Sequence, residues 1–230
     1  FFIDAATYLL SAVLIISITH RSQREAPAPA GWRQVAADAR AGLRYVARHT
    51  VLRDLLLVYG VACAGVASAA TILYVLALDR FAAGASGLAG LDAAITVGLL
   101  LGSLAVGRMD LTGASRTLLL GLFAFAALFS LSAFAPSIVW AGVIFFFTGV
   151  ANMFFYVPAA VIVQTESSPR MRGRALAAKH VLTRSLSVVG FVGAGALVEH
   201  VGIPQTILLT SALVGAAAVV GWSRPRLRSA

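Results

Sequence analysis

The chain has 230 residues, of which 60% are hydrophobic and only 12% are charged, and its formal net charge is +9. Soluble domains carry roughly 45–50% apolar and about 25% charged residues, so a water-soluble fold of this composition is excluded. The composition predicts an all-α integral membrane protein. The positive charge does not indicate nucleic-acid binding, because the arginines lie between apolar stretches and form no single basic face.

Seven apolar stretches follow one another along the chain, each long enough to cross a bilayer as a helix. They cover residues 1–19, 55–78, 88–107, 117–135, 138–163, 175–198 and 203–222. The fourth and fifth stretches together are uncharged and too long for one crossing, and Pro136 with Ser137 marks the break between them. Three stretches contain charges: Asp4 in the first, Asp92 in the third, and Lys179 with Arg184 in the sixth.

The Lys and Arg residues are distributed unevenly over this predicted layout. Seventeen of the 18 lie on one side of the membrane, and only Arg80 lies on the other. The positive-inside bias places the larger group, and with it the C-terminus, in the cytoplasm of a multi-pass protein of the cell's inner membrane. The first stretch then starts at the outer face without the features of a signal peptide, so we expect an upstream, already inserted portion.

The connection over residues 21–54 is the only long one in this layout. Its part from 25 to 31 reads as an extended Pro/Ala linker. From Trp32 to Val46 apolar residues recur at spacings of three and four, which predicts an amphipathic helix. Arginines occupy its other side, at Arg40, Arg44 and Arg48. Two placements stay open for this helix: the headgroup layer of the membrane, or the protein's own cytosolic loops.

Three stretches carry motifs that occur together in one family. They are Phe2-Ile-Asp-Ala-Ala-Thr-Tyr-Leu-Leu-Ser-Ala12, Ala41-Gly-Leu-Arg-Tyr-Val-Ala-Arg-His-Thr-Val-Leu-Arg53 and Gln164-Thr-Glu-Ser-Ser-Pro-Arg-Met-Arg-Gly-Arg174. They resemble the sixth helix, the central cytosolic helix and the loop between helices ten and eleven of the major facilitator superfamily, most nearly its bacterial drug, macrolide and siderophore exporters. The resemblance covers essentially the whole chain, as helices six to twelve of twelve. One turn departs from the family pattern, because it keeps Asp110 and Gly113 but has Leu111 in place of a basic residue.

The resemblance implies a division of the chain into four parts. Residues 1–20 are the last helix of a truncated N-terminal half, 21–54 a cytosolic linker with an amphipathic helix, 55–222 the C-terminal six-helix half and 223–230 a cytosolic tail. It also implies a secondary active transporter, a proton-coupled exporter or antiporter of small amphipathic compounds that works by alternating access. Its partners are then the lipid bilayer, a small-molecule substrate and the missing N-terminal half. We expect no enzymatic activity, no cofactor, no metal and no nucleic acid.

By the same resemblance, helices seven and ten, over 55–78 and 138–163, line the central cavity. Four polar residues there are candidates for the substrate pathway: Ser68, Asn152, Tyr156 and Gln164. Asn152 stands near the middle of its span, where an unpaired amide is costly. The Ser68 hydroxyl has the alternative of bonding its own helix or packing two helices together.

Charged residues near or within the spans supply the other candidates. Arg184 is costly inside the membrane and is expected to meet an anionic substrate or a carboxylate, whereas Lys179 is expected to reach the cytoplasm by snorkelling. Asp4 and Asp92, near the outer ends of their spans, are candidate proton carriers, with simple solvation as the alternative.

The loop between helices ten and eleven is the candidate cytosolic gate. Its residues are Arg172, Gly173 and Arg174, with Asp110 in the neighbouring turn. Arginine is favoured beside the C-terminus of helix ten by the helix dipole, and glycine allows backbone conformations that a Cβ blocks. The alternative is that these arginines only fix the topology.

Two other function classes are less consistent with the sequence. A seven-helix receptor or sensor has the same number of spans, although the chain's single lysine, Lys179, lies in the sixth stretch and not in the seventh, where an opsin needs it. A membrane enzyme is disfavoured because the histidines are scattered and no nucleophile–base pair stands at a membrane edge. Cys63 reads as a small packing residue.

Overall fold

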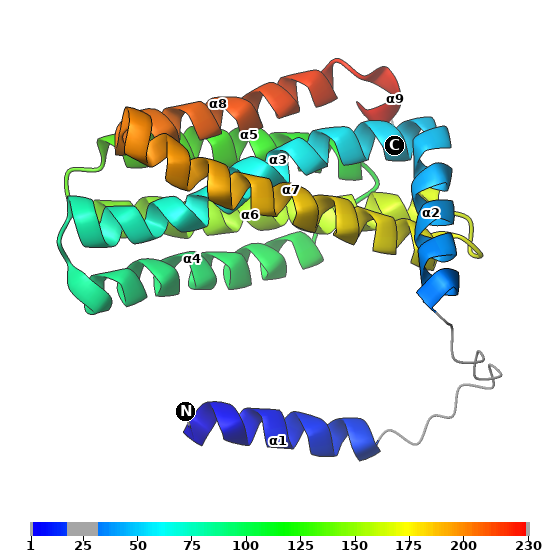
Figure 1. Ribbon diagram of the computed structural model, residues 1–230, viewed down its shortest axis with the longest axis horizontal. Helices are drawn as coiled ribbons and strands as arrows, with labels where there is room; N and C mark the ends of the chain where they lie inside the picture. Colours follow the sequence, from blue (N-terminus) through cyan, green and yellow to red (C-terminus); the bar gives the residue numbers. More distant parts are fainter. Residues whose placement is uncertain (1, 18–31, 229–230) are drawn as a thin grey trace. The chain divides into compact units, whose positions relative to one another are not determined.

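The structure is a computed structural model that describes residues 2–17 and 32–228. Every regular element within those residues is a helix (Figure 1). The elements are α1 (Phe2–Ser17), α2 (Trp32–Arg48), α3 (Thr50–Val75) with a π-helical end (Leu76–Arg80), α4 (Gly84–Gly107), α5 (Ala114–Leu131) with a 3-10 end (Ser132–Phe134), α6 (Ile138–Glu166), α7 (Arg172–Val201), α8 (Ile203–Trp222) and α9 (Pro225–Arg228). Six of them, α3 to α8, are long and apolar enough to cross a membrane. This confirms the predicted all-α membrane class.

The predicted spans agree with these helices to within a few residues at most ends. The last span coincides with α8, and the break predicted at Pro136 falls between the 3-10 turn and α6. Thr50 begins α3 five residues earlier than the apolar pattern indicates, because Arg53 and Asp54 belong to the helix although they are charged. In the first span, α1 has 16 residues, and residues 18 and 19 lie outside the described residues, as does the linker predicted at 25–31.

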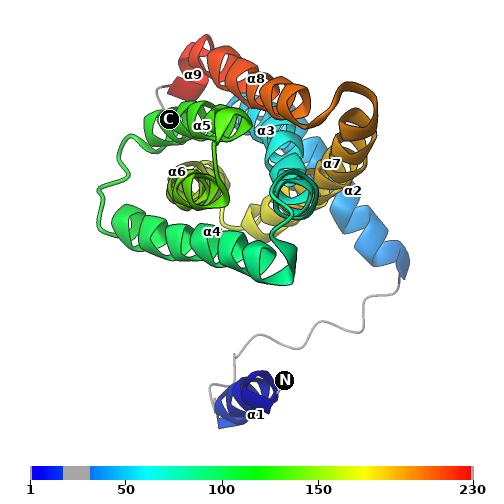
Figure 2. The same ribbon diagram turned by 90° about the vertical axis from the view of Figure 1, so that its left-hand side faces the viewer.

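The chain divides into two compact units, residues 1–37 and 38–230, which are described separately. In the second unit the six long helices form two groups of three, seen end-on in Figure 2. In one group α3 packs against α7 and α8; in the other α6 packs against α4 and α5; α5 and α8 join the groups. Exchanging α3 with α6, α4 with α7 and α5 with α8 maps the contacts of one group onto those of the other and the α5–α8 contact onto itself. Because α3 begins at the end of the bundle where α6 finishes, the two groups run in opposite directions, as inverted repeats do.

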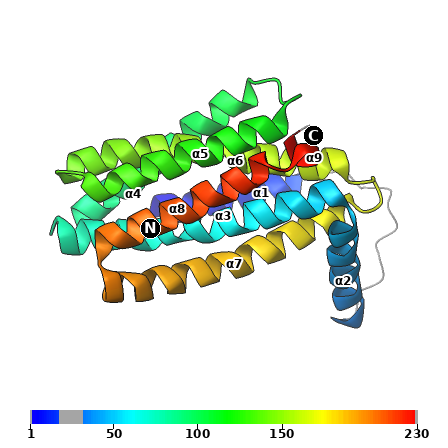
Figure 3. The same ribbon diagram turned by 90° about the horizontal axis from the view of Figure 1, so that it is seen from above.

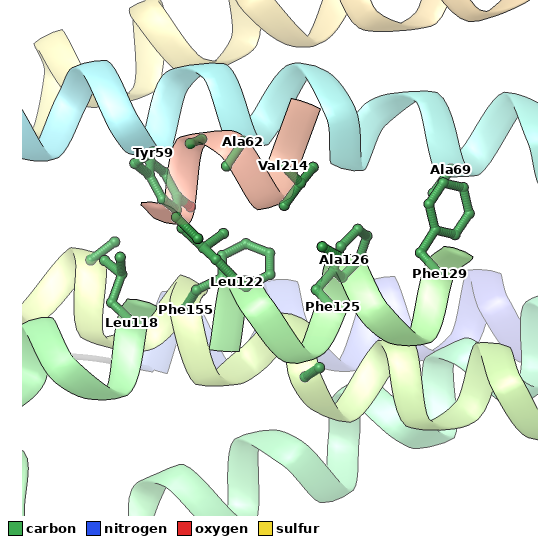
Figure 4. Packing of buried hydrophobic residues seen from close by; sticks show 14 of the residues in the cluster. Tyr59, Ala62, Ala69, Leu118, Leu122, Phe125, Ala126, Phe129, Phe155 and Val214 are labelled. Carbon is green, nitrogen blue, oxygen red and sulfur yellow. The ribbon is translucent and has the colours of Figure 1, made fainter. Parts of the chain in front are cut away.

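An aromatic core lies where the two groups meet. Phe125 of α5 meets Phe155 of α6 edge to face, with ring centroids 5.7 Å apart, and Phe129 lies 5.8 Å from Phe125. Figure 4 shows these rings facing Tyr59 of α3 and Val214 of α8. All of them are almost completely buried, so the core connects the two groups through side chains of four helices.

Glycines bring two equivalent pairs of helices into backbone contact. Gly190 of α7 lies directly over the carbonyl of Ala64 in α3, and the Ser68 hydroxyl donates to the carbonyl oxygen of Gly190 at 3.1 Å. In the other group Gly98 of α4 lies over the carbonyl of Phe146 in α6. Helices in lipid gain little from the hydrophobic effect, so such close contacts between small residues contribute much of their association.

The two ends of the bundle are fixed by different arginine contacts. At one end Arg80 donates to the carbonyl oxygens of Ala133 and Ala135 at 2.8 and 3.1 Å. These hydrogen bonds satisfy backbone carbonyl groups at the C-terminal end of the α5 segment. At the other end the buried Asp54 accepts from Arg53 at 3.3 Å, and the Arg224 guanidinium lies 3.9 Å from the same carboxylate. The latter contacts join α3 to the segment after α8.

From Asp38 onward α2 lies across the end of the bundle where α3 begins, as Figure 3 shows. Gly42 lies against the carbonyl of Arg174, and the Ser168 amide donates to the Tyr45 hydroxyl at 3.2 Å. Three arginines in the described part of this helix are exposed: Arg40, Arg44 and Arg48. The described part of α2 therefore packs its small and apolar side on the protein's own loop, while its arginine side faces outward.

The glycine contacts predict a position-specific effect within α7. Gly190→Ala places a Cβ against the backbone of Ala64 and should destabilise the bundle by about 1–3 kcal/mol, the usual cost of overpacking. Gly193→Ala, on the same helix with open space around its Cβ position, is the matched control and should be neutral. Thermal unfolding of the detergent-solubilised protein measures both. Equal midpoints for the two variants would contradict the proposed helix contact.

Candidate functional site

A cavity of about 250 Å³ lies between α3, α6 and α7. Polar and aromatic side chains from all three helices line it, and those that matter for its chemistry are Tyr59, Cys63, Asn152, Tyr156, Lys179 and Arg184. Asn152 stands about midway along α6. The cavity is therefore an internal polar site in a bundle whose other surfaces are mainly apolar.

The spacing of the lining residues explains why they meet. On α7, Lys179, Thr183 and Ser187 line the cavity at intervals of four residues, and on α3 Tyr59 and Cys63 are separated by the same interval. Residues four apart lie on one face of a helix, so each helix presents one polar stripe to the cavity. The Thr183 hydroxyl donates to the carbonyl oxygen of Lys179 at 2.9 Å and is satisfied within α7.

Lys179 is the most unusual side chain of the cavity. Only 2% of its surface is exposed, and its Nζ lies 4.9 Å from the ring centroid of Tyr59 and 5.2 Å from that of Tyr156. Aromatic faces attract cations, and more strongly where water is excluded. Within the part of the chain that the structure describes, the Lys179 ammonium has no ion pair and no hydrogen bond.

The expectation that Lys179 snorkels to the cytoplasm is therefore wrong. Its side chain is held between the rings of α3 and α6, because the faces of Tyr59 and Tyr156 attract the cation. The Tyr59 ring is itself buried and packs edge to face on Phe155, with centroids 6.3 Å apart. Arg184, which the sequence analysis took as the confined cation, is exposed and lies along the wall of the same cavity.

The predicted pathway residues divide into two sets. Asn152, Tyr156 and Arg184 come together in the cavity. Ser68 is not among the lining residues, since its hydroxyl lies in the α3–α7 contact and donates to the carbonyls of Ala64 and Gly190. Gln164 is exposed near the end of α6 and is also outside the lining.

The predicted acids and gate residues lie elsewhere. Asp92 is exposed on α4, and the side chain of Asp4 lies outside the described residues. The Asp110 carboxylate accepts from the amide of Thr112 at 3.1 Å in the turn after α4.

The loop residues Arg172 and Arg174 are exposed at the start of α7. Gly173 has open space where a Cβ would stand and does not have a positive φ. Gly173 therefore does not adopt a backbone conformation that a Cβ would block.

Tyr59 and Cys63 were not predicted as lining residues, and the predicted place of Lys179 was wrong. A signal was present, because the chain's only lysine is followed at four-residue steps by Thr183 and Ser187 within an apolar run. Of its two aromatic partners, Tyr156 on α6 was a predicted pathway residue, whereas Tyr59 on α3 gave no comparable signal.

Two further cavities differ in chemistry from this site. One lies between α3 and α8 with a volume of about 230 Å³, and the other between α5 and α6 with about 360 Å³. Apolar side chains dominate both linings, with Asp54 and Arg224 at one end of the first. They resemble grooves that lipid chains fill, and they offer few groups to recognise a polar ligand.

Comparison with known proteins agrees with this architecture. The family profile described as transmembrane secretion effector, a profile of the major facilitator superfamily, matches residues 1–229. The chain belongs to the major facilitator superfamily. As a member of this superfamily of membrane transporters it is a multi-pass membrane protein, and the seven-helix receptor is not favoured.

One curated relative of this facilitator chain is the uncharacterised MFS-type transporter YfiS of Bacillus subtilis (strain 168). The two are 26% identical over 230 residues, which cover 93% of this chain and 53% of the relative. The chain thus spans about half the length of the relative that it matches. No solved structure matches the chain.

Because the Lys179 ammonium has no ionic partner among the described residues, we expect that removing its charge stabilises the fold. Lys179→Met removes a buried charge without an ionic partner among the described residues, so it should raise the free energy of unfolding by about 1–3 kcal/mol, the usual penalty of an uncompensated polar group. Arg184→Met, at an exposed position of the same cavity, should change it little. Thermal denaturation in one detergent compares the two, and a clear loss of stability in Lys179→Met would contradict the described environment.

Proposed function

We propose that this chain forms the C-terminal half of a secondary active transporter that exports small amphipathic compounds in exchange for protons. The observation that carries the proposal is the cavity between α3, α6 and α7, which combines buried aromatic surface with Asn152, Lys179 and Arg184. An apolar body and a polar head find partners in such a site. Two of its three helices are those that the family resemblance assigns to the central cavity.

Alternating access is supported by the arrangement of the helices. The pattern of contacts between α3, α7, α8 and α6, α4, α5 is that of an inverted repeat. Of the six long helices, α4 and α7 have the smallest buried share of their most apolar 18-residue stretch, 22% and 17%. Their exposed sides therefore offer a surface to the N-terminal half. On this proposal residues 1–20 complete that half, and the two halves rock about the cavity.

The orientation follows from the charges. The arginines of α2, of the α4–α5 turn and of the α6–α7 loop belong to the end of the bundle that carries Asp54, and Arg80 belongs to the other end. By the positive-inside bias the first end is cytoplasmic, together with the C-terminus, in the inner membrane.

Proton coupling rests on the family resemblance and on two acids. No carboxylate lines the described part of the cavity, and the carriers that we propose on this chain are Asp4 and Asp92. Asp92 lies on the exposed side of α4, where the N-terminal half would exclude water from it. Loss of transport driven by a pH gradient in Asp92→Asn vesicles, with substrate binding retained, supports this role; full transport in Asp4→Asn and Asp92→Asn excludes both acids.

The substrate cavity can be tested through Cys63, the chain's only cysteine, which lines it. In the protein of natural length, with any other cysteine replaced by serine, saturating phenylnaphthylamine (an uncharged amphipathic dye) should slow maleimide labelling of Cys63 several-fold, because bound dye covers the thiol.

The control carries Cys63→Ala and Leu213→Cys, which moves the thiol to the apolar α3–α8 groove, and its labelling rate should not change. Equal effects of the dye at both positions would point to partition into the membrane and would contradict a substrate site at Cys63.

The cytosolic gate is proposed for the loop that holds α2. Three contacts fix this loop: Gly42 on the Arg174 carbonyl, the Ser168 amide on Tyr45, and His49 at 3.9 Å from Glu166. The loop thus carries the exposed Arg172 on a rigid support, from which it can contact acids of the other half when the inner side closes.

Arg172→Ala should lower transport roughly two- to five-fold, the scale of one exposed ion pair, without changing the amount inserted in the membrane. Arg116→Ala, at another exposed cation at the same end of the bundle, serves as the control. Vesicle uptake of a dye substrate, normalised to protein amount, measures the difference. Unimpaired transport by Arg172→Ala would leave the arginine with a topological role alone.

A further inference from the structure

The cavity between α3, α6 and α7 has an uneven distribution of charge. Among the described residues its lining contains Lys179, Arg184 and His180, and neither an aspartate nor a glutamate. A cationic ligand would meet repulsion in such a site, and a neutral ligand would leave the buried ammonium without a counter-charge.

Lys179 points to the kind of ligand that fits. Its side chain is 98% buried, its ammonium lies against two tyrosine rings, and it has no hydrogen-bond or ion-pair partner among the described residues. Aromatic faces stabilise a cation but leave its N–H donors unused. An oxyanion supplies what these rings do not, because it accepts charge-assisted hydrogen bonds from the ammonium.

The rest of the lining describes the body that carries this anion. Tyr59, Phe155, Tyr156 and Phe191 supply aromatic surface, and Asn152 supplies an amide that can both donate and accept. The cavity's volume of about 250 Å³ is near the lower end of ligand pockets, so it accommodates a small aromatic or branched apolar group beside the anion.

We propose that this cavity is an anion-selective substrate site, in which Lys179 binds the carboxylate or sulfonate of a small amphipathic compound and the aromatic side chains hold its apolar body. The inference rests on the proposed transport function and specifies its substrate class. Arg184, exposed at the same wall, gives the anion a first cationic contact on the way to Lys179.

A pair of dyes with the same body tests the role of the charge. Anilinonaphthalenesulfonate carries a sulfonate, and phenylnaphthylamine has the same ring system without it. Binding to the protein of natural length, in nanodiscs of phosphatidylcholine, is followed by dye fluorescence. Only the fraction lost after Cys63 is blocked with a bulky maleimide counts as binding in the cavity.

Lys179→Met should raise the Kd of the sulfonate dye roughly ten- to hundred-fold, the equivalent of one charge-assisted hydrogen bond, and leave that of phenylnaphthylamine within about two-fold. Lys179→Arg keeps the charge and should retain most of the preference. Arg116→Gln removes one exposed charge that is not part of the cavity lining and should leave the binding of both dyes unaffected. Thermal unfolding of each variant verifies that it is folded.

Three results would overturn the proposal, and they have different meanings. In the first, both dyes bind in the cavity and Lys179→Met leaves the ratio of their Kd values unchanged. The ammonium is then neutralised by another part of the protein, and the anion preference fails while the proposed transport site stands. If neither dye shows binding that depends on Cys63, the proposed substrate site fails as well. If phosphatidylglycerol displaces the sulfonate dye from the natural protein but leaves binding to Lys179→Met unchanged, a lipid headgroup occupies the site.

Discussion

Backbone contact between helices is the constraint on which the rest of this structure depends. Helices in lipid cannot rely on the removal of apolar surface from water, so their packing relies on close approach of small residues. Gly190 against Ala64 draws α7 onto α3, and Gly98 against Phe146 draws α4 onto α6. These two contacts occupy equivalent places in the two groups of three helices. They fix the frame within which a space is left between α3, α6 and α7.

That space is where the bundle tolerates a charge that its surroundings do not neutralise. Elsewhere the described charged groups lie at the ends of the bundle or pair with one another, as Asp54 does with Arg53 and Arg224. Lys179 instead lies between two tyrosine rings that the aromatic core holds in position, since Tyr59 packs on Phe155 and Phe155 on Phe125. A native fold keeps an isolated buried ammonium at a cost in stability. Binding of an anion is the function that we propose for it.

The helical fold was largely predictable from the sequence, because hydrophobic length alone determines where a chain crosses lipid. The limits of α8 were predicted to the residue, whereas the start of α3 was not, since Arg53 and Asp54 interrupt its apolar pattern. The pairing of helices was not predictable from hydropathy. It depends on which glycine meets which carbonyl, and neither Gly190 nor Ala64 reveals its partner in the sequence.

The cavity was predictable only in part, for a related reason. Asn152 and Tyr156 could be selected because polar groups inside a span need partners, and they do line the cavity. The place of Lys179 depends on the direction of a long side chain. The general tendency of lysine to reach water was here outweighed by two aromatic rings from other helices, and the sequence of α7 does not contain them.

The central claim is that the polar cavity, and not the apolar grooves, takes the transported molecule. Photo-crosslinking with an aryl-azide derivative of anilinonaphthalenesulfonate, followed by mass spectrometry of the protein of natural length, tests it most directly. The account predicts adducts on three peptides, those that contain Tyr59 to Ala67, Asn152 to Tyr156 and Lys179 to Phe191. Adducts confined to the α3–α8 or α5–α6 groove, in protein that is folded and inserted, would contradict it.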